Sequence, residues 1–193
     1  MPLPDRRRVT DIDALRTIAN PVRYRILGHL MAMGPQTASQ CAAVVGETPS
    51  NCSYHLRELA RFGLVERVDD APGDARERPL RSAATGWEFR PADEARHDAV
   101  AVDANRRLVH AGIDEEARLA HEATDLQDEL DEEWHGATLG STYNLRLTAS
   151  ELADLGDRLD ALIRPFIALT RDDAPPDAEP VHVSLRAYKR PLP

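Results

Sequence analysis

The sequence predicts a mainly α-helical fold with a small amount of β structure. Apolar residues recur at helical spacing through most of the chain, pairs of a capping residue and proline mark helix starts, and alternating apolar residues are confined to short segments. With 193 residues the chain can form one large or two small domains with a hydrophobic core. No apolar run reaches the roughly 18 residues of a membrane span, so no membrane segment is expected.

The first two predicted helices are separated by Asn20-Pro21. The segment DIDALRTIAN forms the first helix and ends at this pair. Asparagine is a favoured N-cap residue and proline is favoured in the first helical position, so the pair opens a second helix over PVRYRILGHLMAM.

A short helix, a tight turn and another helix follow. Thr37 and Gln40 form a capping box that opens the short helix, and Gly46 is a natural C-terminal stop. Thr48-Pro49 then repeats the cap-and-proline signal and opens a helix over SNCSYHLRELAR. This order of elements is that of a helix-turn-helix.

The pattern after Gly63 changes from helical spacing to alternation. The segment LVERV reads as a strand, the loop DDAPGDARER contains a Pro-Gly-Asp turn, and PLRSAA returns as a second strand. Three helices followed by a β-hairpin form a winged helix, and this hairpin carries Arg76, Arg78 and Arg81.

The second helix of the helix-turn-helix has two chemically different faces. Cys52, Leu56 and Leu59 fall together on a helical wheel and mark the buried side. The opposite side carries hydroxyl, phenol and guanidinium groups, which suit base edges and phosphates, although a solvated helix face is the alternative. With the capping residues of the preceding helix and the hairpin arginines, the candidate DNA-contacting residues are Thr37, Gln40, Ser50, Asn51, Ser53, Tyr54, Arg57, Arg61, Arg76, Arg78 and Arg81.

The net charge of −9 is unevenly distributed. Residues 1–90 contain 13 arginines and 11 acidic residues, a net +2, whereas residues 91–193 contain 11 basic and 22 acidic residues, a net −11. The acidity therefore belongs to the second half, and the first half remains compatible with DNA, although +2 is a weak basic footprint.

The second half begins with a predicted long helix over residues 91–133. Its apolar residues form one broad stripe that a small winged helix cannot cover alone, so a second copy of the helix in a homodimer is the simplest partner. The stripe comprises Val102, Leu108, Val109, Ile113, Leu119, Ala120, Leu126 and Leu130.

The remainder predicts a small α/β unit, strand-helix-strand over residues 141–189. STYNLRLT and VHVSLRAY read as strands, and a capping box of Thr148 and Glu151 opens a helix that extends to about Thr170. The predicted domains are therefore a winged helix-turn-helix DNA-binding domain over 1–90 and a dimerisation and effector domain over 91–193.

Residues 11–89 resemble the DNA-binding domain of ArsR-family transcriptional regulators. Two stretches of sequence carry the resemblance. The first is LRTIANPVRYRILGHL, and the second is the pattern S-x-H-L-x-x-L-x-x-x-G-L-V, which is met by Ser53, His55, Leu56, Leu59, Gly63, Leu64 and Val65. It implies a winged-helix homodimer on a palindromic operator. Residues Ser50 to Arg61 would lie in the major groove and the 69–81 wing near the backbone or minor groove.

Many members of that family sense metals, but their ligand patterns are incomplete here. The thiolate site uses a Cys-x-Cys pair, and this chain has Cys41 alone, so Cys41 and Cys52 read as buried small hydrophobes. His110 and His121 have the family's spacing for a second site, and Asp114 and Asp125 could complete it, because zinc accepts imidazole and carboxylate ligands. A solvated helix face is the favoured interpretation, and no metal or cofactor is expected.

No enzyme motif occurs in the sequence, which lacks a phosphate-binding glycine loop, a nucleophile elbow and a His-Glu-x-x-His pair. The leading hypothesis is a cytoplasmic repressor that an effector releases from DNA, and two cysteines without a disulfide framework fit a reducing cytoplasm. Trp87, Trp134 and Tyr143 are candidate walls of an effector site, or simply core residues. The alternative function is a winged helix used for protein–protein contact without DNA.

Overall fold

The computed structural model describes residues 6–68, 78–167, 169, 171 and 173–189. These residues are mainly helical with a few short strands, which confirms the predicted fold class. They separate into two compact units, one formed by residues up to 115 together with 167–181, the other by 116–166 together with the residues from 182 onward.

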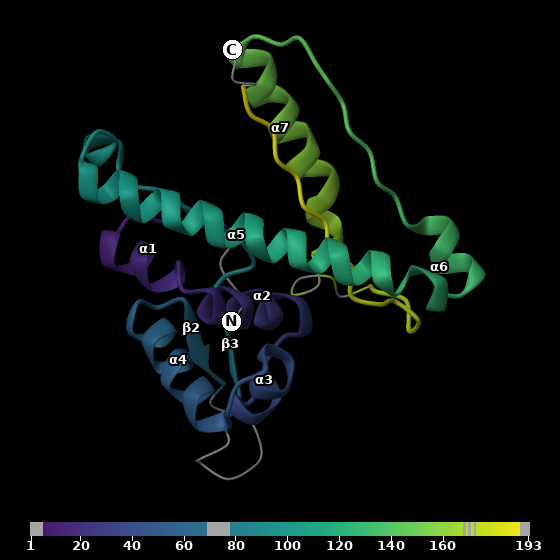
Figure 1. The fold of residues 1–193 in the computed structure, drawn as a ribbon, viewed down its shortest axis with the longest axis horizontal. Coiled ribbons are helices and arrows are strands. Elements are labelled where there is room, and N and C mark those ends of the chain that lie inside the picture. Colours follow the sequence, from purple (N-terminus) through teal and green to yellow (C-terminus); the bar gives the residue numbers. More distant parts are fainter. Residues whose placement is uncertain (1–5, 69–77, 168, 170, 172, 190–193) are drawn as a thin grey trace. The chain divides into compact units, whose positions relative to one another are not determined.

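The first unit begins with the predicted helices. They are α1 (Ile12–Ile18), α2 (Pro21–Met33), α3 (Ala38–Val45) and α4 (Pro49–Arg61) (Figure 1). The caps that the sequence predicts are formed: Asn20 Oδ1 accepts from the Arg23 amide at 3.1 Å, and Thr48 Oγ1 accepts from the Asn51 amide at 3.2 Å. Each oxygen satisfies an amide that has no partner inside its helix, which fixes where the helix begins.

The predicted hairpin is present as β2 (Val65–Arg67) and β3 (Leu80–Ser82). The two strands are antiparallel, with Val65 opposite Ser82. Arg76, on the predicted wing, lies outside the described residues. Four helices with this hairpin form a winged helix-turn-helix.

A second pair of strands was not predicted. β1 (Arg7–Val9) runs parallel to β4 (Trp87–Phe89), and the Arg7 amide donates to the Gly86 carbonyl at 3.0 Å. Three residues with two arginines carry no alternating pattern, so only the approach of a distant segment forms this pair.

The core of the first unit is built from apolar residues of α1 to α4 and the hairpin. Among its side chains without solvent exposure are Leu15, Ile18, Ile26, Leu30, Cys41, Cys52, Leu59 and Leu64. Ala104 and Leu108 of α5 (Ala99–Asp125) join the same cluster, and Figure 1 shows this part of α5 (teal) alongside α1 and α2.

The long helix is shorter than the predicted range 91–133. It is preceded by a 3-10 turn, η1 (Asp93–Ala95), and followed by η2 (Gln127–Glu129) and α6 (Glu132–Ala137). Two aspartates inside the predicted range act as caps instead of helix-interior residues. Asp98 Oδ1 accepts from the Ala101 amide at 2.9 Å, and Asp131 Oδ1 accepts from the Trp134 amide at 2.9 Å, so each starts a helix.

The face of α5 that packs on the core shares only Leu108 with the predicted stripe. The buried residues are small ones with a single leucine: Ala101, Ala104, Leu108, Ala111 and Gly112. The mean direction of this line is about 130° around the helix from that of Val109 and Ile113, by the geometry of 3.6 residues per turn. Val109 and Ile113 are 39% and 43% exposed. Close packing selects small side chains here, and the larger apolar ones remain uncovered.

The second unit contains α6, α7 (Ala149–Ile163) and η3 (Arg164–Phe166). The predicted capping box is formed: Thr148 Oγ1 accepts from the Glu151 amide, and the Glu151 carboxylate accepts from the Thr148 amide at 2.7 Å. The Thr148 amide, and next the Thr148 hydroxyl at 2.8 Å, donate to the Glu151 carboxylate and lower its pKa. The helix ends before the predicted Thr170.

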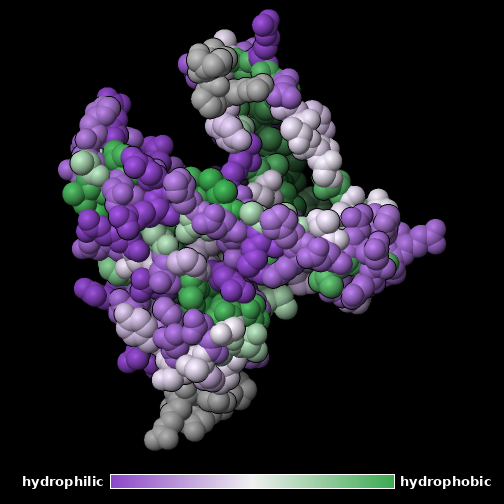
Figure 2. Space-filling view, in the orientation of Figure 1, coloured by the Kyte–Doolittle hydropathy of each residue, from purple (hydrophilic) through white to green (hydrophobic). Residues whose placement is uncertain are grey.

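The predicted strands of this α/β unit are not formed among the described residues. Segments 141–148 and 180–189 have no ladder partner, and their apolar side chains are open to solvent, Tyr143 being 76% exposed. An alternating pattern needs a neighbouring strand to become a sheet. Figure 2 shows hydrophobic residues, in green, gathered where Figure 1 draws α7. Within the described part of the chain, no helix has the length and hydropathy to cross a membrane.

Candidate nucleic-acid interface

The helix α4 is held by one face and presents the other. Its buried residues are Cys52, His55, Leu56 and Leu59, and it packs closely against α3. The turn between α3 and α4 contains Gly46, whose φ of +72° is a left-handed conformation that suits glycine. The helix-turn-helix is thus fixed by a glycine turn and by the leucines that the sequence identifies.

The outward face of α4 carries most of the predicted DNA-contacting residues. Exposed residues on it are Ser50, Asn51, Tyr54, Arg57 and Arg61, while Ser53 is half-buried. Tyr54 is 48% exposed, so its phenol is presented to solvent. The structure therefore brings together six predicted residues on a single helix.

The two arginines of this face are uncompensated. Arg57 Nε donates to the Ser53 carbonyl at 3.2 Å, and the Arg61 guanidinium lies over the Phe62 ring at 5.4 Å. In the described ranges neither arginine is paired with a carboxylate. Both charges remain available to an anion.

Asn51 of this face and the two predicted residues at the start of α3 have hydrogen-bond partners. Asn51 Nδ2 donates to the Glu47 carboxylate at 2.7 Å. Thr37 and Gln40 are used in the capping box of α3, in which the Gln40 Oε1 accepts from the Thr37 amide at 2.8 Å. The amide nitrogen of Gln40 is the donor that this capping box leaves unused.

The wing arginines differ from one another. Arg81 pairs across the hairpin with Glu66, Nη2 to Oε1 at 2.6 Å, so its charge is already compensated. Arg78 is exposed.

His55 is buried on the inner side of α4. Its side chain is 8% exposed and Nδ1 has no hydrogen-bond partner, while its ring meets that of Tyr54 edge-on at 5.4 Å. Burial lowers the pKa of His55, and the nearby Arg23 adds to the effect. The neutral imidazole is therefore the form that the core favours.

The cysteines are buried, as predicted. Burial and the neighbouring Cys52 raise the pKa of Cys41 to about 11, and burial raises the pKa of Cys52. Both are free thiols. A protonated, enclosed thiol is a weak nucleophile and a poor metal ligand.

The candidate metal residues are all on the surface of α5. His110, Asp114, His121 and Asp125 are exposed. In the described part of the chain, no three histidine, cysteine, aspartate or glutamate side chains are grouped to hold a metal ion.

The candidate effector walls are distributed over both units. Trp87 is part of the first unit, where it stacks on Phe89 and its Nε1 donates to Ser82 Oγ at 3.1 Å. This is the core role that the sequence left open. Tyr143 is largely exposed, and Trp134 belongs to α6.

Two neighbouring acids of α5, which no motif of the sequence singles out, have specific partners. Glu115 and Glu116 each pair with an arginine of their own unit. Glu115 pairs with Arg25, and Glu116 accepts two hydrogen bonds at 2.6 Å from Arg186. No local pattern distinguishes such acids from solvated ones, since the partners lie far away in the sequence.

Comparison with known proteins supports the helix-turn-helix. Residues 18–68, which contain α2, α3, α4 and β2, match the family model HTH_20, described as a helix-turn-helix domain. No curated protein matches the chain.

Several solved structures are similar at low identity. The homodimeric winged helix-turn-helix DNA-binding domain of Mb0332 from Mycobacterium bovis, a possible ArsR-family regulator, is 21% identical, covers 57% of this chain and 82% of its own, and has a TM-score of 0.32. PcaV from Streptomyces coelicolor, in complex with its natural ligand, is 22% identical, covers 74% of this chain and 72% of its own, and has a TM-score of 0.29. The MarR repressor from Listeria monocytogenes is 12% identical, covers 78% of this chain and 81% of its own, and has a TM-score of 0.30.

The family match and the geometry agree on the same residues. The two helices of the match are the two that the Gly46 turn joins, and the β2–β3 hairpin follows them. The first unit therefore has a winged helix-turn-helix fold, the fold of DNA-binding transcription regulators.

Proposed function

We propose that the protein is a sequence-specific transcription regulator that binds a double-stranded operator as a homodimer in the cytoplasm. The observation that carries the proposal is the outward face of α4, where Tyr54, Arg57 and Arg61 are exposed on the second helix of a helix-turn-helix. In this motif the second helix enters the major groove, and guanidinium groups bind guanine edges and phosphates.

The contacts would follow the chemistry of each side chain. The N-terminal end of α4, with Ser50, Asn51 and Tyr54, would meet base edges, while Arg57, Arg61 and Arg78 would position the helix on phosphates. Thr37 and Gln40 would contribute from the start of α3. Arg81 would contribute less than Arg78, because Glu66 already compensates its charge.

A homodimer would explain the uncovered side of α5. Val109 and Ile113 are exposed on the helix that the winged helix does not cover fully. A second copy would bury these residues and place two α4 helices on two half-sites. Residues 91–193 would then be the dimerisation and effector domain, and an effector that weakens DNA binding would make the protein an ArsR-like repressor.

A salt titration with a matched variant tests DNA binding. Affinity for a random-sequence duplex is measured across salt concentrations for the wild type, Arg57→Ala and Arg107→Ala. Arg107 is an exposed arginine of α5 that pairs with Asp103 at 2.8 Å, so it controls for the loss of one positive charge.

The expected slope change is specific to α4. Each phosphate contact contributes about −0.9 to the slope of log affinity against log salt, so Arg57→Ala in a dimer should reduce the slope by about 1.8. Arg107→Ala should leave it unchanged. No binding of the wild type at low salt would contradict the proposal and favour the alternative, a winged helix used for protein–protein contact.

A double variant separates DNA recognition from assembly. Tyr54→Ala combined with Arg57→Ala should abolish operator binding, and light scattering should still give the mass of a dimer, because neither side chain belongs to the core. Retained operator binding would show that α4 is not the recognition helix.

A further inference from the structure

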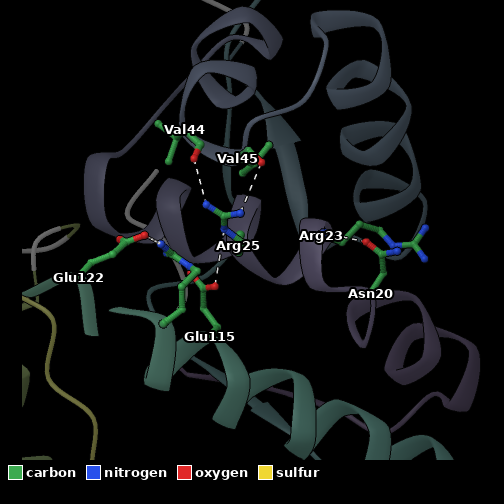
Figure 3. Close-up of polar contacts among 8 residues, drawn as sticks. Asn20, Arg23, Arg25, Val44, Val45, Glu115 and Glu122 are labelled. Carbon is green, nitrogen blue, oxygen red and sulfur yellow. Dashed lines mark hydrogen bonds and ion pairs between the residues drawn. The ribbon is translucent and has the colours of Figure 1, made fainter. Parts of the chain in front are cut away.

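Arg25 of α2 lies between the end of α3 and the helix α5. Figure 3 shows its guanidinium pointing at the last two carbonyls of α3 on one side and at Glu115 on the other. Nη2 donates to the Val44 carbonyl at 3.1 Å, Nη1 donates to the Val45 carbonyl at 3.4 Å, and Nε lies 3.6 Å from Glu115 Oε2. One side chain thus contacts two separate helices.

The contact lies at the point where the helix-turn-helix turns. Val45 is the last residue of α3, and the chain passes through Gly46 and Thr48 to enter α4. The last carbonyls of a helix have no partner inside it and carry partial negative charge, so a guanidinium stabilises them. Arginine suits this position because its planar fork donates in several directions at once, which the single ammonium of lysine does not.

Glu115 occupies a position on the packed face of α5. It follows Ala101, Ala104, Leu108 and Ala111 at steps of three and four residues, so it extends the line of small residues that contacts the core. The Glu115 and Arg25 side chains are only 15% and 25% exposed. A partly buried pair is screened less by salt than a surface pair, which makes it a directional contact between α5 and α2.

We propose that Arg25 and Glu115 are positioning residues that fix α5 relative to the helix-turn-helix, so that a displacement of α5 is passed to the start of α4. The consequence for DNA rests on the proposed function: in a dimer held by α5, this contact would set the placement of the two α4 helices. A signal that moves α5 would displace Glu115 and with it the Arg25 guanidinium, which would weaken the hydrogen bonds to the Val44 and Val45 carbonyls and so shift the turn that leads into α4.

An intrachain distance measurement tests the positioning role without DNA. Spin labels are placed on Ala60→Cys in α4 and Arg106→Cys in α5, both exposed positions of the first unit. The native thiols are enclosed, and labelling of the parent chain checks that they do not react. Doubly labelled chain is diluted with unlabelled chain, so pulsed electron spin resonance reports the distance within one chain whether the protein is a monomer or a dimer.

Three variants are compared in this background. Glu115→Gln should shift or broaden the α4–α5 distance distribution, and Arg25→Lys should do the same because lysine cannot hold both carbonyls and Glu115. Asp103→Asn is the control: it removes an acid of α5 whose partner, Arg107, is on the same helix, and it should leave the distribution unchanged. An unchanged distribution in Glu115→Gln would overturn the proposal, even if the variant unfolds at a lower temperature, because the pair would then only add stability.

A second measurement connects the contact to DNA. If the proposed function holds, Glu115→Gln should weaken binding to the random-sequence duplex by roughly fivefold or more, the size of a typical coupling between sites. Asp103→Asn should bind like the wild type. A changed distance distribution with equal DNA affinity in the two variants would overturn the transmission to α4. If the wild type does not bind the duplex at all, that result would contradict the proposed function, and the distance measurement would still test the positioning role of Arg25 and Glu115.

Discussion

Replacing Leu59 by alanine tests whether the recognition helix owes its place to its buried face. Leu59 has no solvent exposure and belongs to the core cluster that joins α4 to the other helices of the first unit. The change removes three carbon atoms. At about 0.8 kcal/mol per buried methylene the transfer contribution is roughly 2.4 kcal/mol, and the remaining cavity raises the total to about 3–4 kcal/mol.

Urea denaturation followed by fluorescence measures this loss. Trp87 is packed in the first unit, so a Trp134→Phe background makes Trp87 the only indole and its emission reports this unit. With a slope of about 2 kcal/mol/M, Leu59→Ala should lower the midpoint by about 1.5–2 M. Leu139→Ala makes the same chemical change at a side chain that is 85% exposed, and should alter stability by less than about 0.5 kcal/mol. If Leu59→Ala lowers the free energy of unfolding by less than about 1 kcal/mol, the conclusion that the buried face of α4 holds it in the core is wrong.

Three other outcomes are expected. Thr48→Ala leaves the Asn51 amide without its 3.2 Å acceptor and should lower the free energy of unfolding by about 1 kcal/mol in the same urea assay, whereas an unchanged midpoint would show that the cap adds no stability. The pKa of Cys41, raised by burial and by Cys52 to about 11 from 9.0, means that the thiol ionises more readily in the unfolded chain. Its contribution to stability is therefore complete below pH 9 and is lost as the pH rises to about 11, and urea titrations of Cys41→Ala should lack this component. His110→Ala should leave the zinc content of the purified protein unchanged by mass spectrometry, and a fall in zinc would establish a site on α5 that uses this exposed histidine.

Local signals in the sequence determined the helices of the first unit. The helix starts at Pro21 and Pro49 and the capping box of Thr37 depend on hydrogen bonds between residues three positions apart, so a short stretch of sequence contains both partners. The amphipathic pattern of α4 likewise predicts its buried and exposed faces, because 3.6 residues per turn suffices to sort them. The helix-turn-helix and its candidate DNA face follow from such short-range facts.

Patterns without a visible partner were the ones that failed. Segments 141–148 and 180–189 have the alternation of apolar and polar residues that is typical of strands, yet no ladder forms in them among the described residues. A strand needs a neighbouring strand for its backbone hydrogen bonds, and an alternating pattern does not show whether one is present. The range 91–133 appeared as a single helix because periodicity alone does not show that Asp98 and Asp131 turn their carboxylates back to cap new helices.

Tertiary structure alone decided which distant residues meet. Strand β1 pairs with β4, which lies about 80 residues later in the sequence. The small residues of α5, and not its valines, face the core, and Glu115 lies beside Arg25. The sequence by itself determined where the helices start and which face of α4 is polar, since these depend on neighbours within one or two turns. The position of α5 on the helix-turn-helix depends on close packing and on an ion pair between residues 90 positions apart, and no local pattern encodes such a contact.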